Sequence, residues 1–307
     1  MFYDETAHAR ALGENLKAWS LDRFGVEGLD ADRMALTLVP LDAPLTSHAS
    51  GQPAGYSHNG TKSFYPCSVV KAFYLAAVEA RLEEGAVKPH AELERAMHDM
   101  IAWSSNTATN YIIDLVTGTT GDTLLDDTEM REWVERRNWV NRYLQGLGWP
   151  ELQGINVSQK LMDDDRYGRE RMFVQLGGNN HNSLTTLAAA RLFHDIFAGR
   201  VVTPARSRQM AELLHRPLDP AFATLPAAQV EGYFGAGLPA GAKIWSKAGH
   251  TGWTGDATAS YRRHDAAYVE LPNSKAFILV VFTEGQALSE NLSMLPAFAG
   301  HAAALLS

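Results

Sequence analysis

The chain carries a mostly apolar run in its first third, Phe64-Tyr-Pro-Cys-Ser-Val-Val-Lys-Ala-Phe-Tyr-Leu-Ala-Ala-Val-Glu-Ala-Arg-Leu-Glu-Glu-Gly85. Pro66 suits the first turn of a helix, because a proline there loses no hydrogen bond. Apolar residues recur through the run at helical spacing, and Gly85 is well placed to end the helix. The run therefore predicts a helix that is buried on nearly every side.

Two polar residues, Ser68 and Lys71, interrupt the start of this run. They are three positions apart and so share one face of a helix. A lysine amine one turn away can take the proton of a serine hydroxyl if burial lowers the pKa of the amine. The free N–H groups of the helix N-terminus would lie beside any oxyanion that forms. A helix cap and a surface lysine are the simpler interpretation, and the pair alone is only a hypothesis.

Length and composition restrict the class of protein. The chain has 307 residues, which fits one large domain or two closely packed ones. Its share of 46% hydrophobic and 20% charged residues is typical of a globular protein. The net charge of −8, with no offsetting run of Lys and Arg, argues against a nucleic-acid or anionic-membrane binder. Neither nucleic acid nor a membrane is therefore expected as a partner, and the composition leaves the oligomeric state open.

The cysteine count and the N-terminal residues bear on the cellular compartment of the protein. Cys67 is the only cysteine, so no intramolecular disulfide is expected, and its apolar neighbours favour a buried bystander over a reactive thiol. The first residues lack the features of a signal peptide, and no apolar run is long enough to span a bilayer. The expectation is a cytoplasmic protein, or one whose leader has been removed.

Hydrophobic periodicity places strands at both ends of the chain and helices between them. Strands are expected at 34–41, 242–247, 266–271 and 276–283, with a further candidate at 56–65. Helices are expected at 5–24, 66–85, 127–147, 185–199, 203–215 and 290–306, with two more between 89 and 116 around a break at 103–106. This order predicts an α/β (α+β) fold with an antiparallel sheet flanked by helices, built from residues 1–64 and 204–307. An all-helical domain at 65–203 would include an irregular, functional or disordered segment at 150–183.

Two further segments carry polar residues that suit chemistry at Ser68. Ser104-Ser-Asn106 lies at the break between two helices, where a hydroxyl could relay a proton and an amide could hold a substrate amide. Lys247-Ala-Gly-His-Thr-Gly252 directly follows a predicted strand, adds positive charge and has in Gly249 a position that permits close approach. A helix cap and a turn are the ordinary alternatives.

In order, S-x-x-K, S-x-N and K-A-G resemble the signature set of class A β-lactamases and penicillin-binding proteins. The neighbouring residues are similar as well, and the order of elements fits over about residues 30–307. The similar stretches are Phe64 to Lys71, Ser104 to Ile113, and Asn182-Ser-Leu-Thr-Thr-Leu-Ala188. The resemblance implies the β-lactamase/transpeptidase fold, with the site in the cleft between the two domains and an Ω-like loop at about 150–183.

The resemblance also implies roles for individual residues. Ser68 would attack a carbonyl and become acylated, with Lys71 as proton acceptor or electrostatic partner. Ser104 and Lys247 would pass a proton to the leaving nitrogen. The substrate-binding residues implied are Asn106, Gly249, His250 and Thr251, with the backbone N–H groups of Ser68 and His250 forming an oxyanion hole. No metal or other cofactor is needed.

Deacylation in this family uses a Glu of the Ω-loop, and Glu170 is the best-placed carboxylate here. The surroundings depart from the family pattern, since Gly168 and Val174 stand where an Arg and an Asn are usual. A surface role for Glu170 is the alternative. The competing carboxylates are Asp163, Asp164 and Asp165.

Other departures fall on substrate recognition. Ser105 replaces the family's Asp, and Ala248 lacks a hydroxyl that would hold the substrate carboxylate. Thr251, Arg262 or Arg263 could substitute for that hydroxyl. The stretch between Ser68 and Ser104 is also shorter than usual.

The resulting hypothesis is a class A β-lactamase-like serine hydrolase that acts through an acyl-enzyme on Ser68. Its substrate would be a β-lactam or a related amide. The alternatives are a D,D-peptidase or esterase of the same fold, and a non-hydrolytic penicillin-binding or sensor protein. Zinc-ligand spacing, nucleotide-binding glycine loops and a G-x-S-x-G elbow are absent from the sequence.

Overall fold

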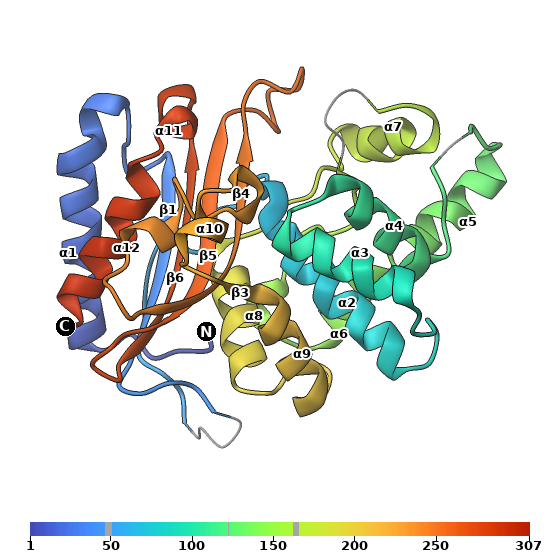
Figure 1. Ribbon diagram of the computed structural model, residues 1–307. Helices are drawn as coiled ribbons and strands as arrows, with labels where there is room; N and C mark the ends of the chain where they lie inside the picture. Colours follow the sequence, from blue (N-terminus) through green and yellow to red (C-terminus); the bar gives the residue numbers. More distant parts are fainter. Residues whose placement is uncertain (47–50, 122, 162–165) are drawn as a thin grey trace.

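The computed structural model describes residues 1–46, 51–121, 123–161 and 166–307, and its centre is an antiparallel sheet (Figure 1). The strand order is β2-β1-β6-β5-β4-β3. The strands are β1 (Met34–Leu41), β2 (Tyr56–His58), β3 (His215–Arg216), β4 (Lys243–Thr251), β5 (Arg262–Glu270) and β6 (Ala276–Glu284). The predicted α/β class, with an antiparallel sheet flanked by helices, is confirmed.

The helices fill the middle of the chain and both ends. They are α1 (Ala7–Phe24), α2 (Lys71–Glu83), α3 (Ala91–Ala102), α4 (Asn106–Thr117), α5 (Asp127–Arg137), α6 (Trp139–Gly146), α7 (Gly168–Gln175), α8 (Thr186–Phe197), α9 (Pro204–Leu214), α10 (Pro220–Ala223), α11 (Gln286–Glu290) and α12 (Met294–Leu305). Short 3₁₀ turns lie at Gly25–Glu27, Cys67–Val70, Pro150–Leu152, Leu176–Gly178, Pro226–Ala228 and Phe234–Gly237. No helix in the described ranges is long and apolar enough to cross a membrane.

The sheet separates two hydrophobic cores, because successive side chains of a strand point to opposite faces. From β6, Leu279 and Val281 pack with α1 and α12, whereas Ile278 and Val280 pack on the side of α8. Figure 1 shows α1 and α12 on one side of the sheet and the helical part of the molecule on the other. Both faces of β6 are therefore covered, which explains its unbroken apolar run.

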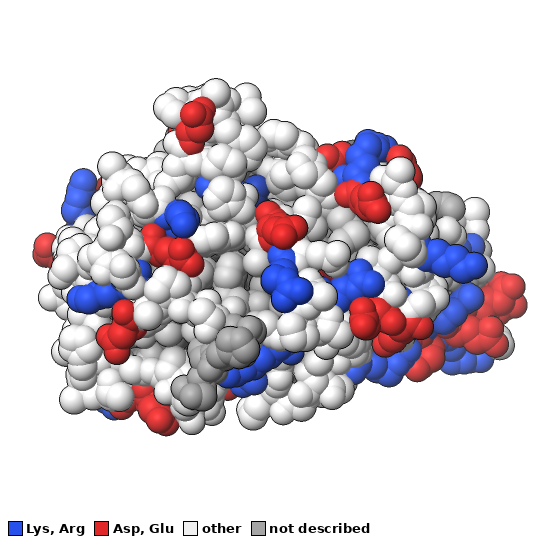
Figure 2. Space-filling model, turned by 60° about the horizontal axis from the view of Figure 1, so that its bottom comes forward, with Lys and Arg blue, Asp and Glu red and all other residues white. Residues whose placement is uncertain are grey.

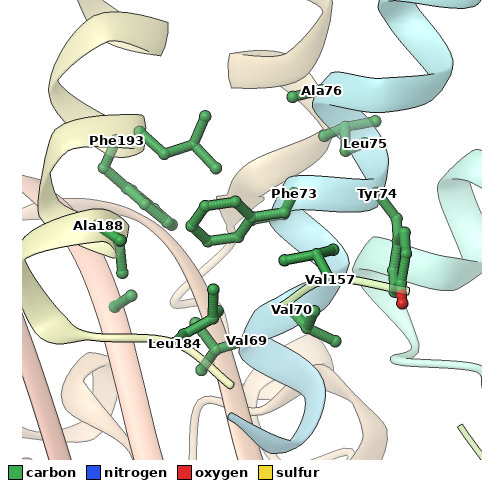
Figure 3. Close-up of a cluster of buried hydrophobic side chains, with 14 of the residues drawn as sticks. Val69, Val70, Phe73, Tyr74, Leu75, Ala76, Val157, Leu184, Ala188 and Phe193 are labelled. Carbon is green, nitrogen blue, oxygen red and sulfur yellow. The ribbon is translucent and has the colours of Figure 1, made fainter. Parts of the chain in front are cut away.

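Helix α2 is the buried centre of the helical part, as its sequence predicts. It contacts α3, α4, α6 and α9, and its residues from Lys71 to Ala80 are all buried. In Figure 3, Phe73 of α2 points toward Ala188 and Phe193 of α8, which itself lies against β1, β5 and β6. Helix α8 therefore connects α2 to the sheet.

Several predicted boundaries were wrong. The predicted helix at 127–147 is two helices separated at Asn138, whose backbone (φ −75°, ψ 7°) leaves the α conformation. Because the helix breaks at Asn138, the two halves face different clusters. Trp133 packs with Phe173, and Val140 packs into the main core. The 66–85 helix begins with a 3₁₀ turn, and its α-helical part starts at Lys71. The predicted 290–306 helix is α12, which begins only at Met294, and the preceding short helix α11 ends at Glu290.

The strand predictions also needed correction near the candidate site. Strand β4 continues to Thr251, so Lys247 and Gly249 lie inside the strand and not after it. The candidate strand at 56–65 is only Tyr56–His58. The segment at 150–183 contains α7, and its ends meet in a bridge between Asn156 and Ser183.

Charge is spread over the surface without a broad basic area on the face that Figure 2 shows. Acidic and basic side chains are interspersed there, and they are most crowded at one end of the molecule. Interspersed charges of both signs give a weak summed field at a distance.

The turn Phe234–Gly237 provides a test of this packing. A Cβ on Gly237 would lie 1.7 Å from the carbonyl oxygen of Pro296 in α12, so α12 must shift. We expect Gly237→Ala to lower the free energy of unfolding by about 3 kcal/mol, measured by urea denaturation. Gly146→Ala is the control, because nothing lies within 4 Å of the added carbon, and we expect no loss. Equal stability of Gly237→Ala and wild type would contradict this packing.

Candidate active site

The candidate nucleophile lies in a constrained turn at the entry to α2. Cys67, directly before Ser68, has φ of +49°, a left-handed conformation that is uncommon for a residue with a side chain. Burial raises the pKa of the Cys67 thiol to about 12, which keeps this thiol inert. Ser68 itself is half-buried and lines a pocket of about 230 Å³, together with Asn106, His250 and Thr251. The structure thus brings four of the predicted site residues to one pocket.

Lys71 is fully buried and is joined to this pocket through Asn106. Its Nζ donates to the Asn106 Oδ1 at 2.8 Å and to the Ser104 carbonyl oxygen at 2.5 Å. The Ser104 Oγ is 3.2 Å from the same nitrogen. Within the part of the chain that the structure describes, the Ser68 hydroxyl makes no hydrogen bond to Lys71. Such catalytic contacts are often long before substrate binds.

Lys247 reaches the same hydroxyl from the sheet. Its Nζ lies 2.9 Å from the Ser104 Oγ and 3.0 Å from the Ala248 carbonyl oxygen, and it also donates to the Gln229 side chain. Burial, followed by the charges of Lys71 and a nearby arginine, holds the pKa of Lys247 well below its usual range. One hydroxyl therefore joins two buried amines, and a proton can pass through it from one amine to the other.

Gly249 brings the edge of β4 directly against the turn that carries Ser68. A Cβ at this position would lie 2.7 Å from both the Ser68 backbone nitrogen and the Cys67 Cβ, so a larger residue does not fit without displacement. The carbonyls of Ser246 and Ala248 accept bonds from side chains outside β5, which places them on the edge of β4 that faces away from β5. Because backbone direction alternates along a strand, the His250 N–H lies on that same edge. This is the edge that faces Ser68.

Arg216 was not among the sequence-predicted residues, yet it connects the two segments that carry the amine and hydroxyl groups. Its buried guanidinium donates to the carbonyls of the last two residues of α3, at 2.6 and 2.9 Å, and to the Ser246 carbonyl at 3.2 Å. Helix α3 leads into Ser104, and Ser246 precedes Lys247. Arg216 thus fixes the distance between them. No local sequence pattern signals these long-range contacts.

Asp265 is a second buried charged residue near Lys247 that sequence reasoning missed. It pairs with Ala248 across β4 and β5, and its Oδ2 accepts the Phe234 N–H at 3.0 Å. Among the described residues its Oδ1 has no hydrogen-bond partner. Burial raises the pKa of Asp265 to about 7, although the charges of Arg216 and Lys247 act in the opposite direction.

The structure does not bring Glu170 to the pocket that Ser68 lines. Both of its carboxylate oxygens accept from the fully buried Arg137 of α5, at 2.6 and 2.9 Å, and Lys160 lies 4.0 Å away. Glu170 is itself only 3% exposed. Such a bidentate pair has the geometry of a structural connection between α5 and α7. The competing carboxylates, Asp163, Asp164 and Asp165, lie outside the described residues.

The residues predicted to replace the hydroxyl missing at Ala248 are engaged elsewhere. Thr251 lines the pocket but donates its hydroxyl to the Ala259 carbonyl at 2.6 Å. Arg262 pairs with Glu284 at 3.4 Å. Arg263 is buried, and its Nε donates to the carbonyl of Ser289 at 2.6 Å. Neither arginine lines the pocket.

Comparison with known proteins adds a family and a set of similar folds. The model of the family described as "Beta-lactamase enzyme family" matches residues 87–305. No curated protein matches the chain.

Among solved structures, the chain resembles PBP-A, in a mutant described as an acyl-enzyme complex with penicillin G. The identity is 18%, with 95% of this chain and 96% of that chain covered and a TM-score of 0.62. A β-lactamase from Chitinophaga pinensis is 16% identical over 95% and 97% of the two chains, with a TM-score of 0.62. One from Sphaerobacter thermophilus is 20% identical over 94% of both, with a TM-score of 0.60. At these identities the likeness concerns the fold.

The raised pKa of Asp265 predicts a pH-dependent contribution to stability. The native carboxyl keeps its proton up to a pKa of about 7, whereas an unfolded Asp loses it near pH 3.9. Between these values the native state binds the extra proton, so stability falls as the pH rises. We expect Asp265→Asn to gain on the order of 3 kcal/mol relative to wild type between pH 4 and pH 7, measured by urea unfolding.

The matched control for this measurement is Asp22→Asn, on the exposed face of α1. Its stability should follow that of the wild type across the same pH range. A constant difference between Asp265→Asn and wild type at every pH would contradict the prediction.

Proposed function

Because the chain belongs to the β-lactamase enzyme family, we propose that it is a serine hydrolase that forms an acyl-enzyme on Ser68. The observation that carries the proposal is the Ser104 hydroxyl between the buried amines of Lys71 and Lys247, at 3.2 and 2.9 Å. Lys71 also donates to Asn106, which lines the same pocket as Ser68. It provides a proton acceptor, a relay and positive charge at one place.

The acylation step can be written with these groups. The Ser68 Oγ attacks the substrate carbonyl carbon, and neutral Lys71 takes the hydroxyl proton. The oxyanion is stabilised by the backbone N–H groups of Ser68 and His250. As the carbon–nitrogen bond breaks, the Ser104 hydroxyl gives its proton to the leaving nitrogen and is reprotonated by Lys71. Lys247 holds the Ser104 hydroxyl in position throughout.

A β-lactam or a related amide is the substrate class that suits this sequence of steps. The leaving group is then an amide nitrogen, which needs the proton that Ser104 delivers. Asn106 lines the pocket and has a side-chain amide of the kind that recognises a substrate amide. A protein of similar fold, PBP-A, is described as forming an acyl-enzyme with penicillin G.

The environment of Glu170 favours a second candidate function. Both oxygens of the Glu170 carboxylate are occupied by Arg137, and Glu170 does not line the pocket of Ser68, so it is poorly placed to activate a water there. We propose a structural role for Glu170. Slow deacylation, and hence a penicillin-binding or sensor role, is therefore the alternative to rapid hydrolysis. A D,D-peptidase or esterase would use the same Ser68.

The first prediction of this proposal concerns the covalent intermediate. Mixing the protein with penicillin G should produce an adduct on Ser68, visible in the intact-protein mass over time, and Ser68→Ala should produce none. Loss of the adduct with release of opened product would support the hydrolase, and a persistent adduct would support the penicillin-binding role. If neither penicillin G nor a chromogenic cephalosporin forms an adduct, β-lactam chemistry on Ser68 is excluded.

The second prediction separates structure from catalysis at Glu170. Glu170→Gln should leave the rates of adduct formation and loss within about twofold of wild type and lower the free energy of unfolding by about 3 kcal/mol, because Arg137 keeps a buried charge. Glu132→Gln, on the exposed face of α5, is the matched control and should change neither quantity. Accumulation of acyl-enzyme in Glu170→Gln alone would assign deacylation to Glu170 and refute the structural role.

A further inference from the structure

A second hollow of about 200 Å³ adjoins the Ser68 pocket. Its lining includes Arg166, Arg171, His181, Thr254 and Asp256, and Thr254 belongs to the lining of both hollows. One wall comes from α7 and the residues around it, and the other from the loop between β4 and β5. Figure 1 shows α7 and this loop at the same end of the molecule. We call this hollow the arginine pocket.

Among the residues that the structure describes, the lining of the arginine pocket holds two arginines and one carboxylate. Over the described residues, the one Asp or Glu in this lining is Asp256, whose Oδ2 lies 2.5 Å from the Nε2 of His181. Over the described ranges of the chain, neither Arg166 nor Arg171 forms an ion pair with a carboxylate. The Nε of Arg166 is buried and has no hydrogen-bond partner there. A buried donor without a partner is costly, and an anion would relieve that cost.

The order of residues along β4 places this pocket on the acyl side of a bound substrate. Lys247, which holds the proton relay for the leaving nitrogen, precedes the oxyanion-hole residue His250, and Thr254 follows it. The leaving group and the acyl substituent of an amide lie on opposite sides of its carbonyl. The acyl substituent therefore extends toward Thr254, over a span of at most about 13 Å for four extended residues.

We propose that the arginine pocket binds an anionic group at the far end of the acyl substituent, so that this protein prefers amides whose acyl chain ends in a carboxylate. The inference deepens the proposed function and rests on it for the position of the reacting carbonyl. Arg166 and Arg171 donate to the carboxylate, and guanidinium groups suit this geometry because their donors match both oxygens. The preference for a terminal carboxylate therefore depends on whether the acyl chain of the substrate is long enough to reach from the Ser68 pocket to the arginine pocket.

A matched pair of substrates tests the inference. 6-Aminopenicillanic acid carrying an adipoyl chain or a hexanoyl chain differs only in a terminal carboxylate or methyl group. For wild type, kcat/KM for acylation of Ser68, followed by intact mass, should be about tenfold higher for the adipoyl compound. Arg166→Gln/Arg171→Gln should remove this preference and leave the hexanoyl rate unchanged. An equal rate for both compounds in wild type, or a preference retained in the variant, overturns the inference.

Two controls separate charge, stability and chemistry. Arg136→Gln/Arg208→Gln removes the same charge from exposed positions and should keep the preference. If neither compound acylates Ser68, the proposed function fails, and the arginine pocket is then judged by calorimetry on Ser68→Ala. Tighter binding of the adipoyl compound, lost when Arg166→Gln and Arg171→Gln are added, supports the pocket. Equal binding of the two compounds refutes it.

Discussion

The contact on which the proposed site depends is the one between a single hydroxyl and two buried amines. The Ser104 Oγ lies within 3.2 Å of Lys71 Nζ and 2.9 Å of Lys247 Nζ, and both lysines are fully buried. Removing two amines from water is costly unless each finds acceptors. Asn106 and the Ser104 carbonyl serve Lys71, and Gln229 and the Ala248 carbonyl serve Lys247. The requirement to satisfy both amines brings together α2, the α3–α4 turn and β4.

Two residues of these segments have backbone conformations that are unfavourable for residues with a side chain. Cys67 and Ser104 both have positive φ, at +49° and +54°, and each such residue costs on the order of 1 kcal/mol or more. The surrounding contacts hold these conformations in place. Gly249 allows β4 to touch the Ser68 turn, and Arg216 connects the end of α3 to β4. Cys67 directly precedes Ser68, and Ser104 is itself one of the proposed reacting residues. The contacts that hold these two backbone conformations therefore also position the reacting groups before a substrate binds.

Sequence reasoning succeeds here where the controlling interactions are local or periodic. The apolar spacing of α2 and the unbroken apolar run of β6 follow from burial on several sides, and both were predicted. The set formed by Ser68, Asn106 and His250 was predicted from motif order, and the structure places these residues around one pocket. Their catalytic roles stay predictions.

The features that could not be predicted from the sequence depend on contacts between segments that are distant in the chain. The partner of Glu170 is Arg137, 33 positions away on another helix, and no spacing rule connects them. The sequence does not predict where β4 ends, because the residues from Lys247 to Gly249 are also typical of a turn. In the structure, pairing with β5 continues through them. The interruption at Asn138 is concealed because the apolar spacing continues across it, even though the two halves pack into different cores.

The buried charges around Lys247 have a joint effect on the proton that the site can carry. Burial lowers the pKa of Arg216 only to about 10, so this guanidinium remains charged at neutral pH. Burial lowers the pKa of Lys247 and raises that of Asp265 to about 7, and attraction between them favours the ionised form of each. Loss of the Asp265 proton therefore favours a protonated Lys247. The charge beside Ser104 therefore depends on the protonation of both groups. With Arg216 as a constant cation, the summed charge of these three groups stays positive whichever member of the pair holds the proton, and positive charge favours a developing oxyanion.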